Sequence, residues 1–271
     1  MKPITISEQL MFNTIKLTAH DSSSGTGFFY HFNINDTIVP TIITNKHVVC
    51  NNSNETMTFR LHLSNGENST EESIDITWTT YWYFHPTHDL CFCFVNPLFE
   101  EVKLKTNKKV FYKNNDESII GLQEKLDELS AIEELVMVGY PIGLWDSVNN
   151  LPIFRKGFTA SHPAMDFNGK NIGLIDMACF PGSSGSPIYI LNENGYSDKK
   201  GNTYLGAKRI IFLGILYSGP TFNVEGKLIV KDIPTKQTPM FQTTLMANLG
   251  YYIKANEILS FKNEIIKILN L

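Results

Sequence analysis

The chain has 271 residues, 42% hydrophobic and 18% charged, which is ordinary for a globular protein able to bury a core without disulfide or metal staples. Its formal net charge of −4 gives no basis for a nucleic acid or an anionic membrane as partner. No stretch approaches the ~20 apolar residues of a membrane span, and residues 1–10 lack the features of a secretory signal, so we expect a cytoplasmic location.

The predicted elements are mostly short strands, because apolar and β-branched runs alternate with turn residues along the chain. These runs cover residues 12–17, 27–33, 38–44, 56–63, 74–80, 90–95, 109–112, 135–139, 153–160, 173–179, 186–191, 209–217 and 228–230. They predict an all-β fold of two six-stranded antiparallel β-barrels, the first over residues about 11–112 and the second over 135–254. The basic run at 103–109 is interpreted as a solvated turn.

Two further segments have helical spacing. The polar, acidic stretch 113–134 is predicted to be a linker with a short helix at 122–129. At the end of the chain, Ile258, Phe261, Ile265 and Leu269 recur at intervals of three and four, which predicts an amphipathic helix over 255–271.

The four cysteines show no metal-binding spacing. Cys91 and Cys93 lie two apart in a strand-like run and therefore face the same side. In apolar stretches a free cysteine behaves as a small hydrophobe. We expect no metal and no other cofactor.

Three segments together carry candidate chemistry. A turn, CFPGSSGSP at 179–187, offers a serine with Gly182 and Gly185 beside it, and glycine tolerates the backbone shape that a pair of converging N–H groups needs. A strand leads directly into His47, a candidate base, and Asp89 stands at the mouth of an apolar strand, where it could orient that base. Alone, each has a structural explanation: a hairpin turn, a surface or core histidine, and a strand cap.

The order of the three candidates is His, Asp, Ser, which is the chymotrypsin order rather than that of subtilisin or of α/β-hydrolases. With this order, the motifs TNKHVV, HDLCFCFV and GSSGSP resemble those of the trypsin/chymotrypsin superfamily. The likeness is greater to its bacterial branch that includes the HtrA protease domains. It continues in GILYSG at 214–219 and GYYIK at 250–254, and so covers nearly the whole chain.

The resemblance implies a serine endopeptidase that acts on protein or peptide substrates. Ser184 would be the nucleophile, His47 the base and Asp89 its orienting acid, with the N–H groups of Gly182 and Ser184 as oxyanion hole. It also places Ala178 at the floor of the P1 pocket and Tyr217, Gly219 and Gly250 at its walls. Because no charge stands at the floor, we expect an apolar P1 residue such as Leu, Phe or Tyr.

Three departures from the family pattern matter. Digestive members carry an Asp before the nucleophile, which pairs with a newly cut N-terminus; Ser183 stands there, so we expect no such activation and instead an activating protein partner that gates the enzyme. Tyr217 replaces a serine that supports the triad Asp. HtrA proteins carry a PDZ module after the protease domain, whereas this sequence stops at the predicted helix, so we do not expect it to belong to the HtrA group proper.

Two other functions remain open. A non-catalytic binding module, or pseudo-protease, would use the double barrel as a scaffold, although such proteins usually lose a catalytic residue. An esterase or acyltransferase could use the same triad, which the ratio of ester to peptide turnover would decide.

Overall fold

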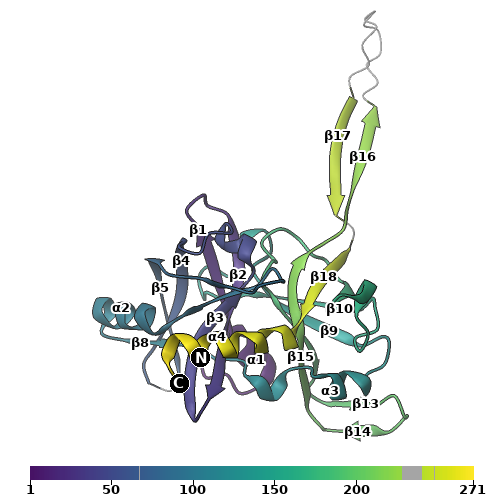
Figure 1. Cartoon of the computed structure of the whole chain (residues 1–271), viewed down its shortest axis with the longest axis horizontal. Helices are drawn as coiled ribbons and strands as arrows, with labels where there is room; N and C mark the ends of the chain where they lie inside the picture. The colour runs from purple at the N-terminus through teal and green to yellow at the C-terminus, as the bar shows by residue number, and fades with distance from the viewer. Residues whose placement is uncertain (67, 228–239, 247) are drawn as a thin grey trace, which may run out of the picture.

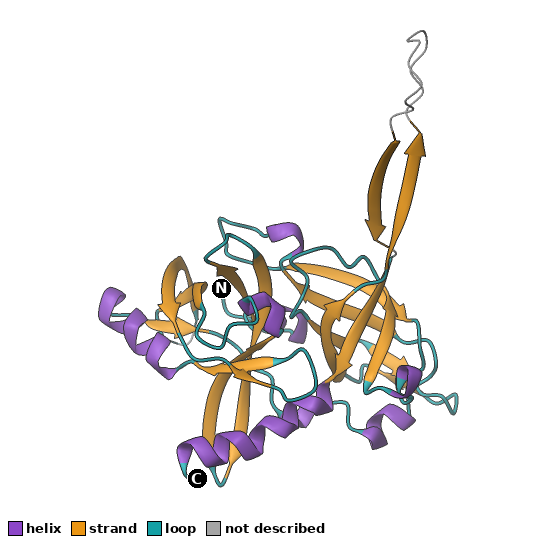
Figure 2. Ribbon diagram, turned by 45° about the horizontal axis from the view of Figure 1, so that its top comes forward, coloured by secondary structure: helices purple, strands orange, loops and turns teal. Residues whose placement is uncertain are grey.

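The computed structural model describes residues 1–66, 68–227, 240–246 and 248–271. Two sheet-built halves lie side by side, and most of the helices lie on the outside of the molecule (Figures 1 and 2). The fold is mostly β, as predicted, with a closed six-stranded barrel, a second sheet and a C-terminal helix.

The first half is an eight-stranded antiparallel sheet. Its strands run in the order β5-β4-β1-β2-β3-β7-β6, and β8 pairs with β4. They are β1 (Thr14–Ala19), β2 (Ser24–Ile34), β3 (Thr37–Thr44), β4 (Thr56–Ser64), β5 (Ser69–Thr79), β6 (Tyr83–Phe84), β7 (Cys91–Phe94) and β8 (Lys109–Phe111). The sequence predicts a six-stranded barrel here, whereas these pairings form an open path of more strands; two-residue β6 is too short to show a period of two.

The second half is the closed barrel β10-β11-β18-β15-β12-β9, as predicted. Its strands are β9 (Glu134–Gly139), β10 (Ile153–Thr159), β11 (Ile172–Asp176), β12 (Pro187–Asn192), β15 (Arg209–Ser218) and β18 (Leu249–Lys254). Two hairpins are added to it: β13 (Gly195–Ser197) with β14 (Thr203–Leu205), and β16 (Thr221–Lys227) with β17 (Met240–Met246). The second hairpin projects far from the barrel (Figure 1). The strand predicted at 228–230 lies outside the described residues.

The helices are short. They comprise α1 (Ile6–Met11), α2 (Asn96–Thr106), α3 (Gln123–Asp127) and α4 (Phe261–Leu269), with 3₁₀ turns η1 (Lys46–Val49), η2 (Glu117–Ile119), η3 (Pro141–Gly143), η4 (Phe167–Gly169) and η5 (Ala255–Ser260). The predicted terminal helix therefore begins as a 3₁₀ turn. Of the basic run 103–109 predicted as a turn, the first four residues instead end α2, residues 107–108 form a bend, and Lys109 begins β8. Lys103 and Lys105 complement the helix dipole.

An apolar cluster joins the two halves. Phe28 of β2 meets Phe212 of β15 edge-to-face, with ring centroids 5.3 Å apart. Phe261 and Ile265 of α4 are buried in the same cluster, so the C-terminal helix packs against the core that spans both halves. The sequence also predicts that residues 1–271 form a single domain, with 113–134 as the linker between its two barrels, and this stays a prediction.

The cysteines are free thiols, and three of the four, Cys91, Cys93 and Cys179, are buried. Among the described residues, no helix is long and apolar enough to cross a membrane.

Candidate active site

His47 is placed by the end of strand β3. The chain leaves β3 at Thr44, passes through extended Asn45 and enters the single turn η1, which presents the half-exposed His47 side chain. Asn45 Nδ2 donates to the Asp89 carbonyl at 2.7 Å, which ties this turn to the segment before β7. The end of β3 and the buried Asn45 amide therefore bring His47 close to Asp89.

Asp89 binds His47 at two points. Its Oδ2 lies 2.6 Å from His47 Nδ1, and its Oδ1 accepts the His47 backbone N–H at 3.2 Å. Burial raises the pKa of Asp89, but the hydrogen bonds from His47 and from the Lys46 backbone outweigh it and hold that pKa below its ordinary value. The carboxylate is therefore charged at neutral pH and fixes the orientation of the imidazole.

Ser184 lies in a tight turn at residues 179–186, the serine turn, between β11 and β12. Gly182 and Gly185 have φ of +82° and +83°, which side-chain-bearing residues rarely adopt. The N–H groups of Ser183, Gly185 and Ser186 donate to Phe180, Leu216 and Ser183 carbonyls. In the part of the chain that the structure describes, the N–H groups of Gly182 and Ser184 meet no acceptor, as an oxyanion hole requires.

Thr26 of β2 joins the serine turn to the first half. Its N–H donates to Ser184 O at 2.9 Å, and its hydroxyl donates to Gly182 O at 3.2 Å. Its carbonyl accepts the Thr44 hydroxyl at 2.7 Å, three residues before His47. The two halves of the site are thus linked through one residue that sequence reasoning missed, because an isolated Thr in a strand carries no signal.

Ser184 and His47 are not hydrogen-bonded to each other. Neither Ser184 Oγ nor His47 Nε2 has a hydrogen-bond partner among the described residues. In proteases this bond is often long in the free enzyme and tightens with substrate.

The residues predicted to line the P1 pocket are spread over three elements. Ala178 precedes the serine turn, and Gly250 lies on β18, where an added Cβ would be 2.4 Å from Cys179 Sγ. Gly219 directly follows β15. Tyr217 of β15 lines a cavity of about 510 Å³ together with Asp89, His88 and Asn171, and its place in the P1 pocket stays a prediction.

Arg155 of β10 is a second residue that sequence reasoning missed. Its Nη1 donates to Ala178 O at 2.7 Å and to Ser183 Oγ at 2.8 Å. In the sequence it is one cation in a predicted strand, and only the closed barrel turns it toward the serine turn.

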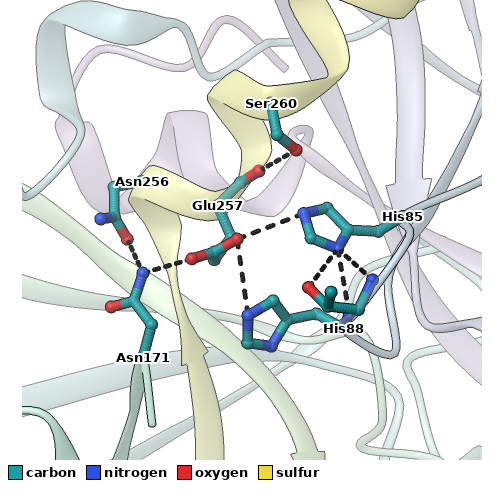
Figure 3. A network of polar contacts seen from close by, with 7 residues as sticks. His85, His88, Asn171, Asn256, Glu257 and Ser260 are labelled. Carbon is teal, nitrogen blue, oxygen red and sulfur yellow. Dashed lines mark hydrogen bonds and ion pairs between the residues drawn. The ribbon is translucent and has the colours of Figure 1, made fainter.

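A polar network anchors the loop before Asp89 to the C-terminal segment (Figure 3). Glu257 Oε2 lies 3.2 Å from His85 Nε2 and 3.5 Å from His88 Nε2, and its other oxygen accepts from Asn171. His85 Nδ1 accepts the N–H of His88 at 2.9 Å, so its proton resides on Nε2, toward Glu257. The network holds the loop that carries Asp89.

One group of possible metal donors occurs among the described residues. Donor atoms of His20, Cys50 and Glu55 lie within 4.8 Å of one another. Glu55 is already bound by His20 Nδ1 at 2.6 Å and by Asn52 Nδ2 at 3.0 Å. An ion pair between His20 and Glu55, supported by the Asn52 amide, therefore explains why these donor atoms lie close together.

The model of the trypsin-like peptidase domain matches residues 25–195, which include all three candidates. The chain therefore belongs to the trypsin-like peptidase family, and its fold is that of a serine protease. The narrower likeness to the HtrA branch stays a prediction. No curated protein matches the sequence.

Solved structures with similar folds are distant. They include a serine protease of a human pathogenic astrovirus (12% identity, 90% of this chain and 89% of that one, TM-score 0.40). A thermostable serine protease from an extremophilic microorganism has 12% identity, 92% coverage of both chains and a TM-score of 0.45. An inactivated protease paralogue of the scabies mite has 10% identity, 96% and 97% coverage and a TM-score of 0.42.

Proposed function

We propose that the chain is a serine endopeptidase with His47, Asp89 and Ser184 as its catalytic triad. The observation that carries the proposal is the double contact between Asp89 and His47, at 2.6 and 3.2 Å. It fixes the proton of the neutral imidazole on Nδ1 and leaves Nε2 as the base. Family membership and the acceptor-free N–H groups of the serine turn support it.

In the proposed reaction, His47 Nε2 takes the proton of Ser184 Oγ as the oxygen attacks the peptide carbonyl. The N–H groups of Gly182 and Ser184 stabilise the oxyanion, and Asp89 stabilises the imidazolium. His47 then returns the proton to the leaving amine, and water hydrolyses the acyl-enzyme by the same steps.

The proposed P1 residue is uncharged and apolar, such as Leu, Phe or Tyr. Ala178 brings no carboxylate to the pocket floor, and the Arg155 guanidinium at its carbonyl repels a basic side chain. A peptide-library profile dominated by Lys or Arg before the cut would contradict this preference.

The proposal retains a gating partner in the cytoplasm. Because Ser184 and His47 are not hydrogen-bonded in the free chain, a bound substrate or protein could favour the state in which they are. Comparing turnover of the purified protein with and without cell extract tests this; full activity alone would remove the need for a partner.

A fluorophosphonate probe tests the nucleophile. The wild-type chain and Ser184→Ala are treated in parallel, and labelling is measured by intact mass. We expect labelling of the wild type only. Labelling of both would show that Ser184 is not the nucleophile, and Ser183 and Ser186 would be the next candidates. Labelling of neither, with cell extract present as well, would favour the pseudo-protease.

A further inference from the structure

Arg155 occupies an unusual position for a cation. It lies on β10, opposite Met137 of β9, and its side chain enters the space behind the segment from Ala178 to Ser184. That segment has no strand pairing of its own, since β11 ends at Asp176 and β12 begins at Pro187. Its shape therefore depends on individual contacts.

One nitrogen of Arg155 connects the two ends of this segment. Nη1 donates to Ala178 O at one end and to Ser183 Oγ at the other. Ser183 is completely buried, and its hydroxyl has no other partner among the described residues. Without Arg155, a buried hydroxyl and a carbonyl would both lose their donor, next to the nucleophile.

The charge of Arg155 is not neutralised by an acid. No carboxylate within the described ranges forms an ion pair with it, and its Nε and Nη2 are enclosed without acceptors. Burial lowers its pKa to about 10, which still leaves it charged at neutral pH. An enclosed cation without an acidic partner is costly for stability. Its presence here is therefore explained by its two hydrogen bonds to the segment that carries Ser184, and not by an ion pair.

We infer that Arg155 is a positioning residue that holds the serine turn in the form in which the N–H groups of Gly182 and Ser184 converge. This inference rests on the proposed function. Arg155 is supplied by the interior of the folded barrel, so the turn needs no newly cut chain terminus to take its active shape. Activation by cleavage is thereby replaced by a contact that forms on folding.

The test compares Arg155→Met, Arg155→Lys and the control Arg209→Met. Arg209 is also a largely buried arginine of the second half, but it pairs with Glu133 at 2.7 Å, away from the turn. The rate of labelling by a small fluorophosphonate is measured on folded protein. We expect Arg155→Met to be slower by roughly 10²–10³, as for loss of an oxyanion donor. Arg155→Lys should recover part of that rate, and Arg209→Met should keep the wild-type rate.

Two further measurements separate positioning from general stability. In Arg155→Ala, added guanidinium chloride at non-denaturing concentration should accelerate labelling, whereas it should not in Arg155→Met, where the side chain fills the space. Amide hydrogen exchange of peptides covering 178–186 should be faster in Arg155→Met than in Arg209→Met. This readout does not depend on catalysis, so it decides the inference even if the wild type is not labelled.

The inference would be overturned, and the proposed function left intact, if the wild type is labelled, Arg155→Met is labelled at the same rate, and hydrogen exchange at 178–186 is equal in Arg155→Met and Arg209→Met. Unlabelled wild type with faster exchange in Arg155→Met would instead contradict the proposed function and support the role of Arg155 in shaping the turn.

Discussion

Asp89 fixes both the position and the tautomer of His47, the proposed base, through its two contacts. Asp89→Asn keeps the shape but presents an amide N–H or a neutral oxygen to His47 Nδ1, which favours the wrong tautomer. We expect turnover of a peptide ester to fall by about 10⁴, with little change in the melting temperature. The control is Asp146→Asn, which alters an exposed aspartate in the turn 146–149. Equal activity of both variants would show that His47 does not act through Asp89.

Thr26 makes a related point at the same scale. Its backbone and hydroxyl contact Ser184, Gly182 and Thr44, so one residue fixes the position of the serine turn relative to the segment that leads to His47. Sequence motifs identified the ends of this chain of contacts, His47 and the serine turn. They could not identify Thr26 between these ends, because hydrogen bonds between the two halves of the molecule leave no periodic pattern in the sequence.

At the scale of elements, the serine turn tolerates no side chain at Gly185. An added Cβ would lie 1.9 Å from Thr26 O and 2.6 Å from Thr44 Oγ1, and φ is +83°. Gly185→Ala should therefore destabilise the protein by roughly 3 kcal/mol or more and abolish labelling, because strand β2 must move away. Gly169→Ala is the matched control: φ is +68°, but nothing lies within 4 Å, so only about 1 kcal/mol is expected. Urea unfolding of both variants measures the difference.

The elements themselves were predicted unevenly. Strands rich in β-branched and apolar residues, such as β3 and β9, follow from the sequence. The hairpin β13–β14 and helix α2 do not, since the first is only three residues long in each strand and the second begins with Asn-Pro, which suggests a turn. The family motifs located the triad candidates, whereas the role of Arg155 depends on barrel closure.

At the scale of the whole molecule, acid stability depends on a buried histidine in the first half. The pKa of His62 is lowered from 6.5 to about 4, mainly by burial and less by Arg60 and the N-terminal ammonium, while a hydrogen bond with the Asn150 backbone opposes the shift. The unfolded chain therefore binds a proton that the folded chain excludes between these values. The free energy of unfolding should be unaffected by this group above pH 6.5 and should fall by roughly 3 kcal/mol as the pH drops to 4.

His62→Gln removes that proton from the balance. Its free energy of unfolding, measured by urea denaturation from pH 7 to pH 4, should fall less steeply than that of the wild type. Parallel curves for the two proteins would show that other groups govern the acid transition.

The contact between the two halves has a consequence for how this molecule is inactivated. His47 and Asp89 belong to one half and Ser184 to the other, and contacts such as those of Thr26 set their separation. The distance between His47 and Ser184, the residues proposed to react, therefore depends on how the two halves pack together rather than on the fold of either half alone. Heat or a destabilising substitution can widen that distance while both sheets stay intact, so the proposed activity would be lost before the secondary structure.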